Sequence, residues 1–187
     1  MKKIVLLIAI ILFSSISLYA QYSFDLVECN AEISQDNVEY YIVKKDTLAV
    51  RKISNSELEI FGTKYKASEQ DVKLSLKVYY NIKLKTFILL ADKKVDYNLG
   101  CDVLMIKNKK SQHIGEMSVA AYTKDENGRM NYNSILPFVS IVKISDRIIF
   151  SFETPLVVIY PGLSEEATLN GRDVYYTYSN SKLQISK

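Results

Sequence analysis

The sequence contains little of the residue types on which most catalytic and metal sites depend. In 187 residues it has no tryptophan, one histidine, two cysteines and six glycines. A zinc site built on His113 would need Cys29, Cys101 or carboxylates as further ligands, and no spacing in the chain brings such a set together. There is no Gly-x-Ser-x-Gly motif and no glycine-rich phosphate-binding loop. We therefore expect no catalytic residue, no metal ligand and no cofactor, and we expect His113 to be a solvated loop residue.

An excess of charge of one sign is also lacking. The chain has 24 basic and 21 acidic side chains, and Lys2 and Lys3 belong to a segment that we expect to be removed, which leaves 22 against 21. A protein this close to neutral has no electrostatic footprint for the phosphates of DNA or RNA. We expect no nucleic acid among its partners.

The N-terminus has the layout of an export signal. Lys2 and Lys3 precede an unbroken apolar run of ten residues over positions 4–13, and small or polar residues follow up to Ala20. This order is typical of a secretory signal peptide. The apolar run is shorter than the roughly twenty residues that cross a bilayer as a helix.

These features predict how the chain is processed and divided. We predict a signal peptide over residues 1–20, cleavage between Ala20 and Gln21, and a single β-rich domain over residues 21–187. No later apolar run is long enough for a transmembrane helix. The mature protein is therefore expected to be exported and to lie in the periplasm, on the outer surface or outside the cell.

Residues 72–85 carry the clearest periodic pattern in the chain. Every even-numbered position from Val72 to Leu84 is apolar or aromatic, and the odd-numbered positions are polar apart from Tyr79. Alternation of this kind places one set of side chains on each face of a β-strand. The pattern predicts a strand of roughly 46 Å, with a covered apolar face and an outer face that carries lysines.

The rest of the mature sequence alternates between short apolar segments and turn signals, about every eight to twelve residues. We count about eleven to thirteen strands on this spacing. Residues 87–90 are apolar on both faces, which predicts either a strand that is buried on two sides or a bulged continuation of the preceding strand. We predict an all-β fold, either an antiparallel β-sandwich or a jelly-roll-like double sheet, with a curved β-barrel as the alternative.

The two cysteines predict a disulfide. Cys29 and Cys101 both lie in the mature chain, and an exported protein meets an oxidising compartment. A bridge between residues 72 positions apart would stabilise the fold by about 4 kcal/mol. Two separate buried thiols are the alternative.

The predicted outer face of residues 72–85 is a candidate interaction surface for an acidic polysaccharide, lipopolysaccharide or an acidic protein. The alternative is that its lysines only protect a long strand against edge pairing. The residues of this candidate surface are Lys73, Lys77, Tyr79, Lys83 and Lys85.

A short motif lies in the predicted hairpin near residue 46. Asp46-Thr47-Leu48 resembles the Asp-Ser/Thr-apolar acceptor triplet of O-glycosylation in secreted Bacteroidetes proteins. The resemblance implies a glycan on Thr47.

Three functions fit these observations. The first is a secreted, non-enzymatic β-sandwich that binds an envelope or extracellular protein or glycan through a sheet face or its end loops. The second is a small hydrolase that uses paired carboxylates, with Glu57 and Glu59 about 6.6 Å apart on one strand face. The missing tryptophan argues against the second, because sugar clefts often use indole platforms. The third is an assembly subunit that passes strands between copies. We expect the first.

Overall fold

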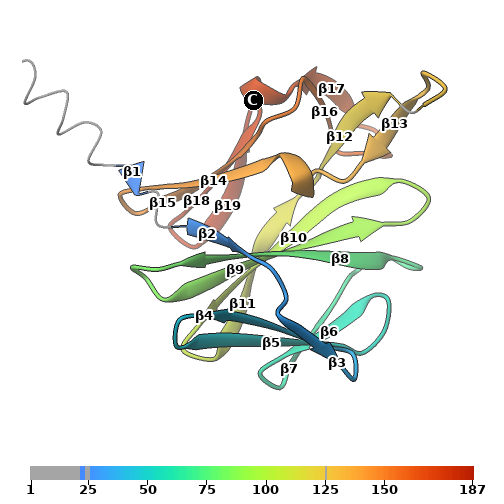
Figure 1. Cartoon of the computed structure of the whole chain (residues 1–187). Helices are drawn as coiled ribbons and strands as arrows, with labels where there is room; N and C mark the ends of the chain where they lie inside the picture. Colours follow the sequence, from blue (N-terminus) through green and yellow to red (C-terminus); the bar gives the residue numbers. More distant parts are fainter. Residues whose placement is uncertain (1–21, 24–25, 125) are drawn as a thin grey trace, which may run out of the picture.

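The computed structural model describes residues 22–23, 26–124 and 126–187, and these form antiparallel strands almost throughout (Figure 1). Two short 3-10 turns, η1 (Leu136–Phe138) and η2 (Gly171–Asp173), are the helical elements of the described part. The predicted signal peptide, 1–20, and its cleavage site between Ala20 and Gln21 lie outside the described residues. Within those residues no helix has the length and apolar character needed to span a bilayer.

A five-stranded central sheet runs through the middle of the molecule. Its strand order is β11-β10-β9-β8-β2. The strands are β2 (Leu26–Cys29), β8 (Lys73–Asn81), β9 (Thr86–Lys94), β10 (Asn98–Lys107) and β11 (Lys110–Met117).

One face of the central sheet is covered by a sheet formed from the strands that lie between β2 and β8 in the chain, which we call the N-terminal sheet. Its strands follow one another in sequence order, β3-β4-β5-β6-β7. They are β3 (Ile33–Gln35), β4 (Val38–Val43), β5 (Asp46–Lys52), β6 (Glu57–Ile60) and β7 (Thr63–Lys66).

The opposite face is covered by two further sheets. The C-terminal sheet has the order β1-β14-β15-β18-β19, and the four-stranded sheet has the order β13-β12-β16-β17. The first contains β1 (Tyr22–Ser23), β14 (Val139–Ile144), β15 (Arg147–Phe152), β18 (Tyr175–Ser179) and β19 (Lys182–Ser186). The second contains β12 (Val119–Lys124), β13 (Met130–Asn133), β16 (Leu156–Ile159) and β17 (Ala167–Asn170).

The central sheet therefore separates two hydrophobic cores. Leu90 and Val103 on one face belong to the same core as Phe150 of the C-terminal sheet. Leu89 on the other face belongs to the same core as Leu48 of the N-terminal sheet. Strand β9 is buried at every position except its last, because it is covered on both sides. This confirms the prediction of a two-sided buried strand at residues 87–90.

The predicted fold class is confirmed. The chain is all-β, its sheets are antiparallel and pack face to face as in a β-sandwich, and none of the described sheets closes on itself as the barrel alternative requires. The strand count was too low, because the structure describes nineteen strands, several of them with only two to four residues. Strands this short carry too few alternating positions to be recognised from sequence.

The prediction of one long strand over residues 72–85 is wrong. Strand β8 ends at Asn81, and β9 begins at Thr86 as its antiparallel partner. Between them the chain turns, with the Asn81 side-chain oxygen accepting a hydrogen bond from the Leu84 N–H at 2.9 Å and with Lys85 at a φ of 49°. Apolar residues within this turn happen to continue the period of the strand, so the alternation does not reveal where the strand ends.

Candidate functional site

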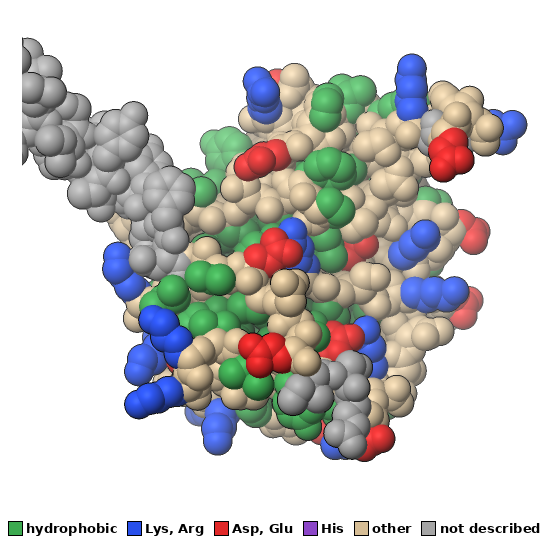
Figure 2. All heavy atoms as spheres, in the orientation of Figure 1, with side chains coloured by type: hydrophobic (Ala, Val, Ile, Leu, Met, Phe, Trp, Pro, Cys, Tyr) green, Lys and Arg blue, Asp and Glu red, His purple; other side chains and the backbone are tan. Residues whose placement is uncertain are grey.

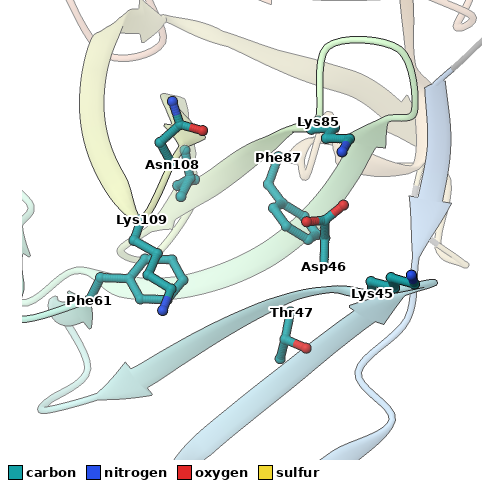
Figure 3. A pocket seen from close by; sticks show the side chains of 9 residues that line it. Lys45, Asp46, Thr47, Phe61, Lys85, Phe87, Asn108 and Lys109 are labelled. Atoms are coloured by element: carbon teal, nitrogen blue, oxygen red, sulfur yellow. The ribbon is translucent and has the colours of Figure 1, made fainter.

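A pocket of about 440 Å³ opens at the end of the central sheet where strand β9 begins (Figure 3). It lies where four hairpin turns meet: β4–β5, β6–β7, β8–β9 and β10–β11. We call it the basic pocket. Its lining residues are Lys45, Asp46, Thr47, Phe61, Lys85, Phe87, Ile106, Asn108 and Lys109.

Tight turns position the side chains around this pocket. Asn108 and Lys109, with φ angles of 51° and 60°, form the two-residue turn between β10 and β11. Phe61 and Gly62, with φ angles of 49° and 77°, form the turn between β6 and β7. Positive φ at both residues is the geometry of a type I′ turn, whose twist matches that of the flanking strands. Each of these two turns therefore has only two residues. Their side chains lie at the same side of the pocket, and Figure 3 shows Lys109 beside Phe61.

The pocket combines an apolar floor with positive charge. Phe87 and Ile106 are buried beneath it, and Phe61 is 37% exposed at its side. Three lysines and one aspartate line it, a formal net charge of +2. No ion pair is described for these three lysines within the part of the chain that the structure covers.

The one acidic residue of the pocket is already engaged. Asp46 accepts a hydrogen bond from the hydroxyl of Tyr80, which lies on the neighbouring central sheet. Burial and this hydrogen bond raise the pKa of Tyr80 to about 12, so its hydroxyl keeps the proton that it donates to Asp46. Because no described ion pair joins Asp46 to the three lysines, their ammonium groups remain available to an anionic ligand.

More lysines surround the mouth of the pocket. Figure 2 shows Lys and Arg side chains gathered at the lower left, the end of the molecule where Figure 1 places the β4–β5, β8–β9 and β10–β11 turns. Exposed lysines on these turns and the adjoining strand ends are Lys44, Lys83, Lys107 and Lys110. This end of the molecule is basic although the whole chain is close to neutral.

A second group of charged side chains lies between the central and N-terminal sheets. Lys93 of β9 is fully buried, and its Nζ lies 2.5 Å from Glu69 Oε1, 2.9 Å from Glu116 Oε1 and 3.5 Å from Asp102 Oδ2. Burial alone would lower the pKa of Lys93, but the hydrogen bond with Glu69 and the charges of Asp102 and Glu116 raise it. Lys93 is thus held as a buried ammonium among three carboxylates.

Asp102 links this group to two further side chains. Its Oδ2 accepts a hydrogen bond from the hydroxyl of Tyr65, and its Oδ1 lies 2.7 Å from Nε2 of His113. Burial and the bond to Asp102 raise the pKa of Tyr65, which therefore stays protonated. We call the whole group the Lys93 cluster, formed by Tyr65, Glu69, Lys93, Asp102, His113 and Glu116.

A β-bulge brings two members of the cluster to the same face of β11. Val103 pairs with Gly115 and Leu104 with His113, so Ile114 has no partner on β10. The extra residue shifts the alternation by one, and His113 and Glu116 therefore point to the same side although they are three positions apart. Gly115 has a φ of 143°, and a Cβ atom there would lie 2.9 Å from Cβ of Leu183 on β19.

The contacts of the Lys93 cluster are those of a structural network. Its carboxylates bind the cluster's own lysine, tyrosine and histidine, and the interactions join β7 and the β7–β8 connection to three strands of the central sheet. Among the described residues no group of three or more His, Cys, Asp and Glu has the geometry to hold a metal ion. We therefore interpret the Lys93 cluster as a network that stabilises the fold.

The predicted disulfide is not formed. Cys29 and Cys101 are free and buried, and they belong to different cores on opposite faces of the central sheet. Strands β8 and β9 separate β2 from β10, which puts the two strands about 14 Å apart. A disulfide needs Cα atoms within about 7 Å. The even number of cysteines therefore does not imply a bridge here.

The predicted row of outward-facing lysines is not present either. Tyr79 is buried, with its hydroxyl donating to the Val139 carbonyl at 3.3 Å, because the C-terminal sheet covers this face. Lys77 is half-buried and donates to the Leu136 carbonyl at 3.0 Å.

The three remaining lysines of that row lie apart from these two residues. Lys73 is exposed at the start of β8, whereas Lys83 and Lys85 lie in the turn after it. Lys85 is thus part of the basic pocket, reached through a turn rather than a strand face.

The other candidate residues are placed as follows. Thr47 is exposed on β5 and lines the basic pocket, so the predicted glycosylation stays a prediction. Glu57 and Glu59 alternate with buried Leu58 and Ile60, as predicted for one strand face, and Glu57 pairs with Lys64 at 3.4 Å rather than lining the basic pocket.

The prediction for His113 was partly wrong. It lies within strand β11 rather than in a loop, with its side chain 48% exposed and bonded to Asp102.

Sequence reasoning missed most of the basic pocket and the whole Lys93 cluster. For the pocket a signal existed, since alternate turns of an antiparallel meander meet at the same end, and the β8–β9 and β10–β11 turns both carry lysines. For the cluster the signal was weaker. Lys93 comes two residues after the apolar run of β9, and only the cover on both faces of that strand shows that Lys93 is buried.

Comparisons of the chain with protein-family models, with curated proteins and with solved structures give no match. The function must therefore be argued from the site itself.

Proposed function

We propose that the chain is an exported, non-enzymatic β-sandwich module that binds an acidic polysaccharide of the cell envelope or extracellular space through the basic pocket. One observation carries the proposal: turns from two packed sheets bring Lys45, Lys85 and Lys109 to one pocket, and the only acidic residue among its described lining residues, Asp46, accepts a hydrogen bond from Tyr80. The N-terminal segment 1–20, with the features of a signal peptide, supports export.

The chemistry of the pocket favours a sugar polymer over other anions. Phe61 offers an exposed ring beside the lysines, and the hydroxyl of Thr47 and the amide of Asn108 offer hydrogen bonds. Sugar rings present apolar C–H faces and hydroxyls together, and a uronic acid adds the carboxylate that the ammonium groups would bind. The exposed lysines on the adjoining turns extend the positive surface, which suits a chain longer than the pocket.

Binding to a polyuronate tests this proposal. We expect the mature protein to bind polygalacturonate and not the neutral polymer dextran, with affinity falling as salt is raised, because ions screen exposed charges. The variant Lys45→Gln/Lys85→Gln/Lys109→Gln should bind at least about tenfold more weakly, since it loses three charge-assisted contacts.

A charge-matched variant provides the control. Lys66→Gln/Lys73→Gln/Lys182→Gln removes the same charge from three exposed lysines outside the pocket. We expect it to bind almost as well as the unaltered protein. Equal losses in both variants, or binding only to acidic proteins or anionic vesicles, would contradict an acidic polysaccharide site at this pocket.

A further inference from the structure

A second hollow lies at the opposite end of strand β9. It has a volume of about 420 Å³, within the range of small-molecule sites. The central sheet, strands β12 and β13, and the residues around the turn η1 line this open hollow. Its lining residues are Ser75, Asp92, Lys94, Asn98, Thr123, Asn133, Ser134, Pro137 and Phe138.

Asp92 is an incompletely paired carboxylate at the inner side of this hollow. It is only 3% exposed, and its Oδ2 accepts a hydrogen bond from Asn98 Nδ2 at 3.2 Å. Its Oδ1 is buried and has no hydrogen-bond partner among the described residues. The Ser134 hydroxyl lies close enough to lower the pKa of Asp92, but its geometry does not make a hydrogen bond to Oδ1. A buried carboxylate oxygen without a donor is costly, and a ligand that supplied one would remove that cost.

The surroundings of Asp92 indicate what kind of donor fits. A divalent cation normally requires several oxygen ligands with more than one carboxylate, and among the described residues that line the hollow Asp92 is the only one with a carboxylate. An organic cation would also meet Lys94, which lines the same hollow, and an anion would be repelled by Asp92. The remaining class is an uncharged ligand with hydroxyl donors.

The other lining groups match such a ligand. Ser75, Ser134 and Asn133 provide hydroxyl and amide groups, and Asn133 Nδ2 donates to Thr123 Oγ1 at 2.6 Å. Phe138 adds an aromatic ring beside these polar groups, where a sugar could place an apolar face. We propose that this hollow binds an uncharged, hydroxyl-rich group such as a neutral sugar unit, with the carboxylate of Asp92 accepting a hydrogen bond from one of its hydroxyls.

Titration with neutral methyl glycosides of glucose, galactose and mannose tests the proposal, with backbone amide resonances of the mature protein as the readout. We expect at least one glycoside to shift the resonances of Asn98, Thr123 and Ser134. Asp92→Asn replaces one acceptor oxygen by a donor and should weaken that binding at least about tenfold. Because Asp92→Asn removes a buried charge with a free oxygen, a loss of binding would not come from unfolding, and the spectrum itself checks the fold.

Three controls make the result specific. Asp96→Asn alters an exposed carboxylate in the adjacent β9–β10 turn and should leave the titration unchanged. The triple lysine variant of the basic pocket should also bind the glycosides unchanged. Failure of the polysaccharide proposal and failure of the proposal for the hollow are therefore distinguishable. The inference would be overturned if no glycoside shifts these resonances, if Asp92→Asn binds equally well, or if calcium or methylammonium binds at the hollow in place of the glycosides.

Discussion

Lys93 and Asp92 are neighbours on β9 and point to opposite faces of the central sheet, where they meet very different surroundings. Lys93 is fully buried and lies within 3.5 Å of three carboxylates. Asp92 is 3% exposed, accepts one hydrogen bond from Asn98 and keeps one oxygen without a described partner. Both are ionisable groups on the most buried strand, so the difference lies in what the covering sheets supply.

The pKa directions express the same contrast. For Lys93, the surrounding carboxylates outweigh burial and favour the charged form. For Asp92, burial outweighs the effects of the nearby Ser134 hydroxyl and of the charge of Lys94, and the pKa rises to about 6. An unpaired oxygen alone does not separate the two groups, because Glu69 Oε2 of the Lys93 cluster also lacks a hydrogen-bond partner among the described residues. The difference is that the Lys93 ammonium lies among three carboxylates, whereas no described ion pair involves the buried Asp92 carboxylate, which makes Asp92 the candidate for a ligand site. We assign stability to the Lys93 cluster and binding to the hollow beside Asp92.

The largest expected effect comes from removing the ammonium of Lys93. Lys93→Met fills a similar volume but leaves Glu69, Asp102 and Glu116 together without a cation, and loss of one side of a buried ion network costs about 3–5 kcal/mol. We expect a loss of this size in the free energy of unfolding, measured by urea denaturation at pH 7. Lys73→Met, at an exposed site on β8, should change it by less than about 0.5 kcal/mol.

A second set of variants ties this loss to charge rather than to packing. Glu69→Gln/Glu116→Gln removes two carboxylates of the cluster, and in this background Lys93→Met should cost clearly less than in the unaltered protein. An equal cost in both backgrounds would show that Lys93 acts through its aliphatic chain, and the assignment of the cluster as an ionic network would be wrong.

At Asp92, removal of the charge should raise the free energy of unfolding at neutral pH rather than lower it. Because its folded-state pKa of about 6 lies above the ordinary value of 3.8, the folded state binds the proton more tightly than the unfolded state. Stability from this group is therefore fully present below about pH 3.8 and is lost as the pH rises through about 6. A pKa raised from 3.8 to about 6 corresponds to about 3 kcal/mol.

Asp92→Asn lacks this titration, so its advantage in unfolding free energy over the unaltered protein should grow by about 3 kcal/mol between pH 3 and pH 7. Lys94, which lowers the pKa of Asp92, and Cys101, which stays protonated in this range, are the other titratable groups around it. Asp96→Asn is the matched exposed control. A pH-independent difference between Asp92→Asn and the unaltered protein would mean that Asp92 is as well solvated or paired as an ordinary carboxylate.

The sequence predicts what depends on local pattern and misses what depends on the number of layers. Alternation and turn spacing are enough for an antiparallel sandwich, and residues 87–90 correctly indicate a strand buried on both faces. Alternation alone cannot place the end of β8, because Ile82 and Leu84 keep the period within the turn. Alternation also assigns Lys77 and Tyr79 to solvent. A period of two separates the two faces of a strand, but it does not say whether another sheet covers the polar face.

The site residues also divide into those that the local sequence pattern indicates and those that only the packing of the sheets brings together. Lys85 and Thr47 are candidates from the sequence and both line the basic pocket. Lys85 meets Lys109 because both lie on turns of the central sheet, whereas Thr47 joins them only because the N-terminal sheet folds over the central one. Lys93 and Asp102 come together because β9 and β10 are adjacent, and His113 and Glu116 join them through an unpaired residue in β11. A bulge of this kind has no signature in one sequence beyond the presence of Gly115.

The smallest expected effect concerns the cysteines, which divide between the same two faces. Cys29 shares its core with Leu89 on the face of Lys93, and Cys101 shares its core with Leu90 on the face of Asp92. With no bridge between them, a reductant should leave the unfolding midpoint of the mature protein unchanged, whereas loss of a disulfide closing so long a loop would cost about 4 kcal/mol.

Burial also slows the chemistry of both thiols. It raises the pKa of Cys29, with a further contribution from Glu28, to about 11, and it raises that of Cys101 further above the ordinary value. Since the thiolate is the reactive form, iodoacetamide should label neither cysteine appreciably in the folded protein and both in denaturant without reductant, as measured by intact mass. Absence of labelling in denaturant until reductant is added would establish the disulfide and contradict the separation of the cysteines by the central sheet. Labelling of Cys29 alone in the folded protein would instead show that the edge strand β2 opens locally, and the face of Lys93 would then be the less stable of the two.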